Sequence, residues 1–233
     1  PLPAVTKSTL AGGGSGMARP GAVSRAHRGV LFLDECAEIR TSVLEALRTP
    51  LEDGEIRLAR RDGVARYPAR FQLVLAANPC PCAPADPKDC ICSSLQRRRY
   101  LGKLSGPLLD RVDLRVPMYT IRAGAFAAEP AESTAQVRAR VAQARAAAAE
   151  RWRKRGFTTN AEVTGAVLRR HFRLGTAAMA PVRAAVDRGL LSFRGVDRSL
   201  RVAWTLADLG GRTTPNVDDV STALSFRQTE LKA

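Results

Sequence analysis

GVLFLDE, residues 29–35, is the stretch that decides the fold of this chain. An apolar run of this length, followed directly by acids, is typical of a strand buried on both faces of a parallel sheet. The acids Asp34 and Glu35 would then emerge at the carboxyl end of the strand, where open α/β sheets place their ligands. The stretch therefore predicts an α/β fold with an acidic edge, although many buried strands end in acids without any function.

A second strand of the same kind follows at residues 71–78, FQLVLAAN, and it ends in the amide of Asn78 instead of an acid. In P-loop NTPases the first acid after such a strand holds Mg²⁺ and a following Glu polarises the attacking water. An Asn on the neighbouring strand can hold that water or a γ-phosphate oxygen. Asp34, Glu35 and Asn78 together are a credible hydrolytic cluster.

Composition narrows the class of protein. The chain has 233 residues, 45% of them hydrophobic and 25% charged, so it is globular and long enough for one large or two modest domains. Its formal net charge of +15 points to a polyanionic partner, and nucleic acid is the leading candidate. The alternative is that the arginines only cover a solvated surface. The absence of a signal peptide and of any long apolar run predicts a soluble cytoplasmic protein with no membrane partner.

A phosphate-binding loop of the form G-x-x-x-x-G-K-[ST] needs glycines that let backbone N–H groups close on phosphate oxygens. Lys7-Ser8 is the nearest match, but Pro1 and Thr6 stand where the two glycines belong. No Lys follows the glycine-rich residues 12–16. The loop is therefore absent from these 233 residues.

A basic hairpin is predicted next. Residues 42–45 form a capping box that should open an amphipathic helix. Residues 55–59 and 64–67 then flank an Arg-Arg-Asp-Gly turn, which is a strong hairpin signal. Arginines near the tip of such a ribbon suit phosphate contacts. An ordinary hairpin that carries its charged side chains on the solvent-exposed face explains the pattern equally well. The arginines in question are Arg57, Arg60, Arg61 and Arg66.

Four of the five cysteines are packed into thirteen residues, as Cys80-Pro81-Cys82 and Cys90-Ile91-Cys92. Four thiols so close together can form a tetrahedral Zn²⁺ site that pins a loop. The C-x-C spacing is less common in zinc sites than C-x₂-C, so four reduced thiols in an ordinary loop remain the alternative. A secreted disulfide framework is not indicated.

The remaining chain divides into two parts. Residues 105–114 predict a short helix that runs into a strand at 113–118, with Arg111 either paired locally to Asp110 or Asp113 or pointing outward as an arginine finger. Residues 122–131 have the composition of a linker. Beyond them, helical patterns predict a second, all-α domain over residues 132–233, with helices at 132–155, 161–171, 177–190, 197–209 and 217–227. Trp152 and Trp204 are expected to pack in its core.

Five segments, in order and nearly without gaps, carry a family resemblance. They are GVLFLDE (29–35), LEALRTPLEDGEI (44–56), YPARFQLVLAANPCPC (67–82), RRYLGKLSGPLLDRVDL (98–114) and SFRGVDRSLRVAWTLADL (192–209). The combination closely resembles the magnesium-chelatase-like AAA+ ATPases of the ComM/YifB competence group, over essentially the whole chain. The resemblance implies residues 1–121 as the C-terminal half of an AAA+ P-loop NTPase core with a pre-sensor hairpin, followed by a helical lid.

The resemblance also implies residue roles. Asp34 and Glu35 resemble the Walker B acids, with Asp34 organising Mg²⁺, and Asn78 resembles sensor 1. Arg111 resembles an arginine finger that acts on a neighbouring subunit. Arg194 resembles the sensor 2 arginine that contacts nucleotide, and Arg198 is a less favoured candidate for the same role. The hairpin at 55–67 matches the DNA-contacting element of related helicases.

The expected function is thus a hexameric, ATP- and Mg²⁺-dependent motor that acts on single-stranded or forked DNA, as a helicase or branch-migration factor in recombination or natural transformation. Two alternatives stay open: a chelatase-type ATPase with a protein partner, and a non-catalytic fragment that joins a ring. Without the Walker A loop, this chain alone is expected not to bind or hydrolyse ATP well.

Overall fold

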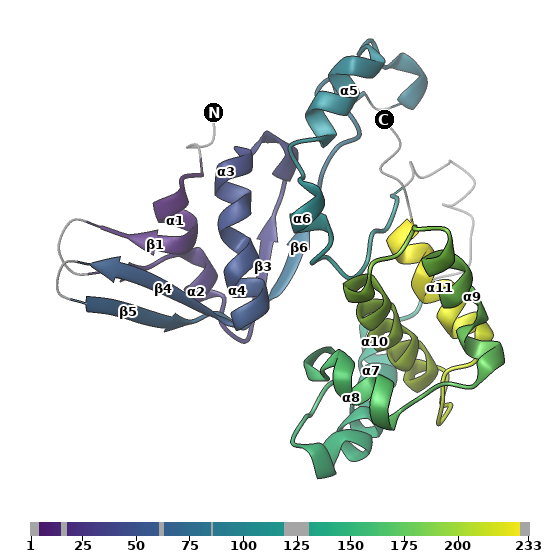
Figure 1. The fold of residues 1–233 in the computed structure, drawn as a ribbon. Coiled ribbons are helices and arrows are strands. Elements are labelled where there is room, and N and C mark those ends of the chain that lie inside the picture. The colour runs from purple at the N-terminus through teal and green to yellow at the C-terminus, as the bar shows by residue number, and fades with distance from the viewer. Residues whose placement is uncertain (1–4, 15–17, 61–62, 85, 119–130, 229–233) are drawn as a thin grey trace. The chain divides into compact units, whose positions relative to one another are not determined.

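The computed structural model describes residues 5–14, 18–60, 63–84, 86–118 and 131–228. These residues form two compact units, the first ending at Val112 and the second beginning at Asp113. Figure 1 shows strands and short helices in the first unit and helices in the second. The predicted linker, residues 122–131, falls almost entirely outside the described residues.

The first unit is built around two parallel strands, β3 (Val30–Leu33) and β6 (Gln72–Leu75), which pair from Val30 with Gln72 to Leu33 with Leu75. The parallel pairing confirms the prediction made from their sequences. The other elements are α1 (Lys7–Ala11), β1 (Gly12–Gly13), β2 (Arg19–Pro20), α2 (Ala22–Arg25), η1 (Cys36–Glu38), α3 (Thr41–Leu44), η2 (Glu45–Leu47), α4 (Arg48–Asp53), β4 (Glu55–Arg60), β5 (Gly63–Pro68), η3 (Pro87–Asp89), α5 (Ser94–Leu101) and α6 (Gly106–Leu109).

The prediction that β3 is buried on both faces is wrong. Leu31 is 7% exposed and packs in the core of the unit, whereas Phe32 on the opposite face is 57% exposed. Val30 and, on β6, Val74 share that exposed face. An apolar run alone does not distinguish a strand covered on two faces from one covered on a single face, because the covering elements are distant in sequence.

The helical segment after β3 buries Val43, Leu44 and Leu47, as its pattern predicts. The capping box at residues 42–45 is wrong, however. Helix α3 already begins at Thr41, after an N-cap residue with no side-chain cap bond. The Glu45 carboxylate instead accepts hydrogen bonds from Arg48 and from Ser105, so it joins this helix to the segment before α6.

The hairpin prediction is confirmed: β4 and β5 pair antiparallel from Glu55 with Pro68 to Arg60 with Gly63. Figure 1 shows the ribbon extending away from the β3–β6 pair. In this register Arg57 stands directly opposite Arg66. Residues 61 and 62 at the tip lie outside the described residues.

The predicted strand at residues 113–118 is wrong. Helix α6 forms as expected, but residues 113–118 contain no helix or strand. Leu114, Val116 and Met118 are exposed, and the backbone N–H of Arg115 donates to the carbonyl of Phe226 (2.9 Å). Pro117 lacks the N–H that a strand ladder would use.

The second unit consists of α7 (Thr134–Trp152), η5 (Arg153–Arg155), η6 (Asn160–Glu162), α8 (Gly165–His171), α9 (Thr176–Asp187), α10 (Phe193–Leu209) and α11 (Val217–Gln228). Its core holds Trp152 and Trp204, both buried as predicted, with edge-to-face contacts to each other and to Phe172. Across the part of the chain that the structure describes, we find no helix with the length and apolar character needed to cross a membrane.

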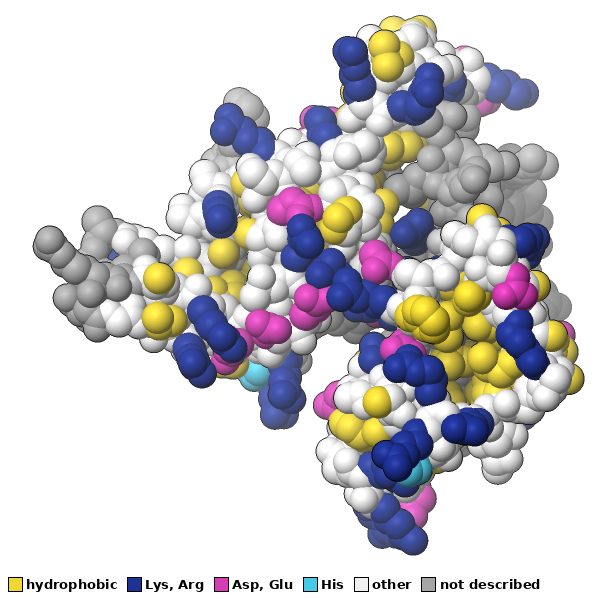
Figure 2. Space-filling view, in the orientation of Figure 1, with side chains coloured by type: hydrophobic (Ala, Val, Ile, Leu, Met, Phe, Trp, Pro, Cys, Tyr) yellow, Lys and Arg dark blue, Asp and Glu magenta, His cyan; other side chains and the backbone are white. Residues whose placement is uncertain are grey.

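Basic side chains are spread over the face of the molecule that Figure 2 shows. On the face shown in Figure 2, Lys and Arg (dark blue) are scattered over both units instead of gathering in one patch. The net charge of +15 therefore supports contact with a polyanion only in a general way. The position of any nucleic-acid contact has to be argued from individual elements.

Candidate functional site

Asp34 and Glu35 follow β3 directly, at the carboxyl edge of the parallel pair. The ladder extends past the strand ends, because Ala76 N–H donates to the Leu33 carbonyl (3.0 Å) and Cys36 N–H donates to the Ala76 carbonyl (2.9 Å). The acidic turn is therefore bonded on both sides to the segment that follows β6. Both acids are exposed, so their carboxylates are accessible to a ligand.

Glu35 adopts a left-handed backbone conformation, with φ of 47° and ψ of 38°. For a residue with a Cβ this conformation costs about 1–2 kcal/mol. Its N–H donates to the Asp34 carboxylate (2.8 Å), and the two ladder bonds hold the residues on either side. Such strain occurs preferentially at active sites and switch regions, so the outlier itself marks this turn as a functional candidate.

Asn78 lies on the segment that continues β6 past the same edge, and it is exposed. The structure thus brings Asp34, Glu35 and Asn78 to one edge of one sheet, as parallel strands require. The acidic turn and the Asn segment are linked through Ala76, whose N–H and carbonyl both take part in the ladder. Carboxylate and amide oxygens are suitable ligands for a hard cation such as Mg²⁺.

Arg111 is held inside its own unit. Its side chain is 7% exposed, forms an ion pair with Glu52 (2.8 Å) and donates to the Pro107 carbonyl (2.6 Å). Pairing with Glu52 was not among the alternatives drawn from the sequence, because Glu52 lies far away along the chain. Asp113, one of the predicted partners, pairs with Arg198 instead (2.5 Å).

Arg194 and Arg198 both lie in the first turns of α10, which Ser192 caps. Arg194 is exposed, whereas the Arg198 side chain is largely buried beside Asp113. This difference in accessibility agrees with the preference for Arg194 as the arginine that contacts a ligand.

Among the hairpin arginines, Arg57 and Arg66 are exposed, and Arg57 forms an ion pair with Glu55 (2.5 Å). The hydrogen bond with Glu55 raises the pKa of Arg57 above its ordinary value. Arg61 lies outside the described residues, and Arg60 is described here only by its backbone pairing with Gly63.

The four clustered cysteines converge. Their sulfur atoms all lie within 4.8 Å of one another, and no other group of metal-ligating side chains of this size is present among the described residues. Hydrogen bonds from Cys92 and Cys80 lower the pKa of the Cys82 thiol to about 7, whereas burial raises that of Cys80 to about 11. The fifth cysteine, Cys36, is buried, and burial raises its pKa to about 11, which makes it a poor nucleophile.

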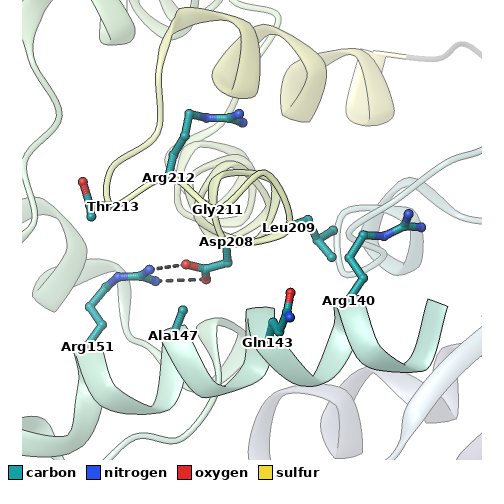
Figure 3. Close-up of a pocket in the computed structure, with 9 residues that line it drawn as sticks. All are labelled: Arg140, Gln143, Ala147, Arg151, Asp208, Leu209, Gly211, Arg212 and Thr213. Carbon is teal, nitrogen blue, oxygen red and sulfur yellow. Dashed lines mark hydrogen bonds and ion pairs between the residues drawn. The ribbon is translucent and has the colours of Figure 1, made fainter. Parts of the chain in front are cut away.

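A cavity of about 370 Å³ lies in the helical unit, between α7 and the end of α10 (Figure 3). Its lining contains none of the site residues predicted from the sequence. Arg151, one of its lining residues, pairs with Asp208, and Asn160 donates to the same carboxylate (2.9 Å) while accepting from the Trp152 indole (2.7 Å). These polar groups satisfy one another and most of the lining residues are exposed, so we interpret the cavity as a surface depression bordered by structural ion pairs.

Two sequence families match the chain. Residues 1–126 match the family described as magnesium chelatase, subunit ChlI, and residues 131–227 match the ChlI C-terminal family. An uncharacterized protein of Mycobacterium tuberculosis is 78% identical over 222 residues, which cover 95% of this chain and 44% of that protein. The competence protein ComM of Haemophilus influenzae is 38% identical over 94% of the chain and 42% of its own length.

The uncharacterized protein YifB of Escherichia coli is likewise 38% identical, over 92% of the chain and 42% of its own length. The chain therefore spans less than half the length of these relatives. The first match, residues 1–126, covers the first unit and extends into the start of the second, and the other match, residues 131–227, covers the helices of the second unit.

Proposed function

Since this chain belongs to the magnesium chelatase ChlI family and is closely related to YifB and ComM, we propose that it is part of an AAA+ ATPase motor that works on DNA. The observation that carries the ATPase part is the acidic turn at the carboxyl edge of β3. Two adjacent carboxylates, one on a strained residue, are bonded through Ala76 to the segment that presents Asn78.

The residues at this edge suit ATP and Mg²⁺. Asp34 would hold the Mg²⁺ ion, because proteins usually bind Mg²⁺ through one or two carboxylates together with phosphate oxygens of the substrate. Glu35 would accept the proton of a water molecule, and Asn78 would orient that water. When bound, Mg²⁺ would neutralise charge on the phosphates. The left-handed turn fixes the direction of the Glu35 side chain relative to Asp34 before any ligand arrives.

Arg111 and Arg194 complete the proposal. As a finger, Arg111 would stabilise charge that develops on a phosphoryl group in the neighbouring subunit of a ring, which we propose to be hexameric. To do so it must exchange its ion pair with Glu52 for that contact. Arg194, exposed at the start of α10, would couple the nucleotide to the helical unit, which would act as a lid.

DNA is the proposed substrate of the motor. Support comes from the net charge of +15, from the hairpin with its exposed Arg57 and Arg66, and from the relationship to a protein named for competence. Arg60 and Arg61 would contact phosphates near the tip, and binding should weaken steeply with salt because bound cations are released from DNA. We propose single-stranded or forked DNA, moved by a helicase or branch-migration activity.

A chelatase-type ATPase with a protein partner is the second candidate, and the name of the matching family favours it. A chain that joins a ring without hydrolysing ATP is the third. The three candidates differ in whether the full-length protein hydrolyses ATP and whether DNA changes the rate.

The first experiment measures ATP hydrolysis by the full-length protein and its Glu35→Gln variant. Gln keeps the size of the side chain but cannot accept a proton, so we expect bound nucleotide with turnover reduced by a factor on the order of 100 or more. Unchanged hydrolysis in the variant would remove Glu35 from the mechanism. Absence of hydrolysis in the wild-type protein would leave the third candidate.

The second experiment adds forked DNA at low and at moderate salt. For a DNA motor, hydrolysis should rise with DNA, the rise should fade with salt, and Arg60/Arg61→Ala should abolish it. Arg138/Arg145→Ala removes the same charge from exposed positions on α7 and serves as the matched control. Hydrolysis that is indifferent to DNA would favour the chelatase-type candidate.

A further inference from the structure

We propose that Cys80, Cys82, Cys90 and Cys92 bind a structural Zn²⁺ ion through four thiolates, and that this ion holds the loop between β6 and α5. The inference is independent of ATP or DNA, because it concerns a part of the chain that the proposed motor chemistry does not use.

The loop has almost no apolar interior of its own. Among the described residues from 79 to 93, Cys80 alone is buried, and the large apolar side chain of Ile91 is 89% exposed. Apart from the short η3, the described part of this loop has no regular secondary structure. Ordering each residue of such a segment costs about 1–2 kcal/mol of conformational entropy, and apolar burial within the loop does not offset that cost.

The sulfur atoms nevertheless lie together. Cys80 is 3.4 Å from Cys82 and 3.5 Å from Cys90, and Cys82 is 3.7 Å from Cys90, measured between Sγ atoms. A tetrahedral zinc site with Zn–S bonds of about 2.3 Å has sulfur atoms about 3.8 Å apart. Disulfide sulfurs would lie about 2.05 Å apart, and all four cysteines are free here.

The ligand set selects the metal and its role. Thiolates are soft ligands, which favour zinc over Mg²⁺ or Ca²⁺. A catalytic zinc keeps one coordination position open for water, whereas four protein ligands close the site. Four cysteines therefore indicate a structural ion.

The backbone beside Cys82 fits this role as well. Ala83, the next residue, has a φ of 40°, which is unfavourable for a residue with a Cβ, and its N–H donates to the Cys80 carbonyl (3.3 Å). This tight turn lets both cysteines of the first pair face the second pair. A bound ion would supply the free energy that keeps the turn closed.

The placement of the loop gives the ion a consequence for the rest of the unit. Cys80 follows Asn78 by two residues, and Cys92 precedes Ser93, which caps α5 with a complete capping box. Helix α5 in turn packs Tyr100 and Leu101 against Ala37, just after the acidic turn. Zinc would thus anchor both ends of a loop that begins and ends beside the candidate site.

The test uses the 233-residue chain, purified under reducing conditions and without chelator. Elemental analysis should find one zinc per chain, and replacement by Co²⁺ should give the visible absorption bands of a tetrahedral cobalt thiolate. A thiol reagent should modify the four cysteines slowly with zinc bound and rapidly after chelation. Metal below stoichiometry after zinc addition, together with absent cobalt bands, would overturn the proposal.

Variants sharpen the test. Cys90→Ser should lose the zinc and the cobalt bands, whereas Cys36→Ala removes a thiol outside the cluster and should keep both. If Cys90→Ser fails to fold, the cobalt titration of the unchanged chain still decides the question. Equal zinc content in Cys90→Ser and the wild-type chain would contradict the assignment, as would recovery of the four cysteines as disulfides by mass spectrometry under the same reducing conditions.

Discussion

The aromatic core of the helical unit and the β3–β6 pair differ in how completely their apolar side chains are covered. In the helical unit, Trp152, Trp204 and Phe172 contact one another, and the charged groups nearby are satisfied by the Arg151–Asp208 pair. In the β3–β6 pair, one face packs in the core, while Val30, Phe32 and Val74 face outward on the other.

The difference separates local from distant causes. A helix with one apolar stripe specifies in its own sequence which face is to be buried. A strand with a continuous apolar run does not, because its second face depends on elements elsewhere.

Asp208→Asn should destabilise the helical unit by about 3–5 kcal/mol, because it leaves the largely buried Arg151 without its counter-charge. Both tryptophans of the chain belong to this unit, so their fluorescence during urea unfolding measures it selectively. Glu150→Gln, which breaks the exposed pair with Arg153, is the matched control and should cost about 0–1 kcal/mol. Equal losses in the two variants would show that the pair is not buried in solution.

Leu31→Ala and Phe32→Ala compare the two faces of one strand. Leu31→Ala should cost about 2–5 kcal/mol through a core cavity. Phe32→Ala should cost less than about 1 kcal/mol, since that side chain is already exposed. Hydrogen exchange in residues 29–35 and 71–78 measures both. Faster exchange for Phe32→Ala than for Leu31→Ala would mean that the outward face is covered in solution.

Glu35→Gly should be more stable than Glu35→Ala by about 1 kcal/mol. Gly adopts the left-handed conformation without a Cβ penalty, and its larger unfolded-state entropy offsets part of that gain. Urea midpoints followed by far-UV circular dichroism give the difference. Identical midpoints would indicate that the turn relaxes out of this conformation.

Glu45→Gln should change the pH dependence of stability. Hydrogen bonds from Ser105 and Arg48 lower the pKa of Glu45, so its ionised form stabilises the folded state above the unfolded pKa. This contribution is lost as the pH falls through the folded pKa. Thermal unfolding from neutral to acidic pH should therefore show a shallower loss in the variant, and parallel curves would contradict the assignment.

Local patterns predicted much of the fold. The parallel strands, the hairpin and the capping box at Ser93–Gln96 were all predictable, because spacing, turn residues and caps act within a few residues. At the start of α11, the Asn216 side-chain oxygen accepts a hydrogen bond from the Asp219 N–H (2.9 Å), which is another contact that a local sequence pattern specifies. The convergence of the acidic turn and Asn78 on one edge followed from the parallel pairing.

Three features were not predictable, because each depends on residues distant in sequence. The Arg111–Glu52 ion pair joins two segments that share no local pattern. The Ser105 hydroxyl donates a hydrogen bond to the Glu45 carboxylate, which the capping-box pattern had assigned to a helix cap. The left-handed Glu35 is a non-Gly residue where sequence rules expect Gly, and the ladder through Ala76 holds it there.

The facing arginines of the hairpin, Arg57 and Arg66, imply two opposing responses to ionic strength. Like charges directly across a strand pair repel each other, and added salt screens that repulsion. The isolated ribbon should therefore be better ordered in high salt, while a phosphate chain lying between the two guanidinium groups would order it in low salt. Salt and a bound polyanion would therefore order the same ribbon under opposite conditions, the salt at high ionic strength and the polyanion at low ionic strength.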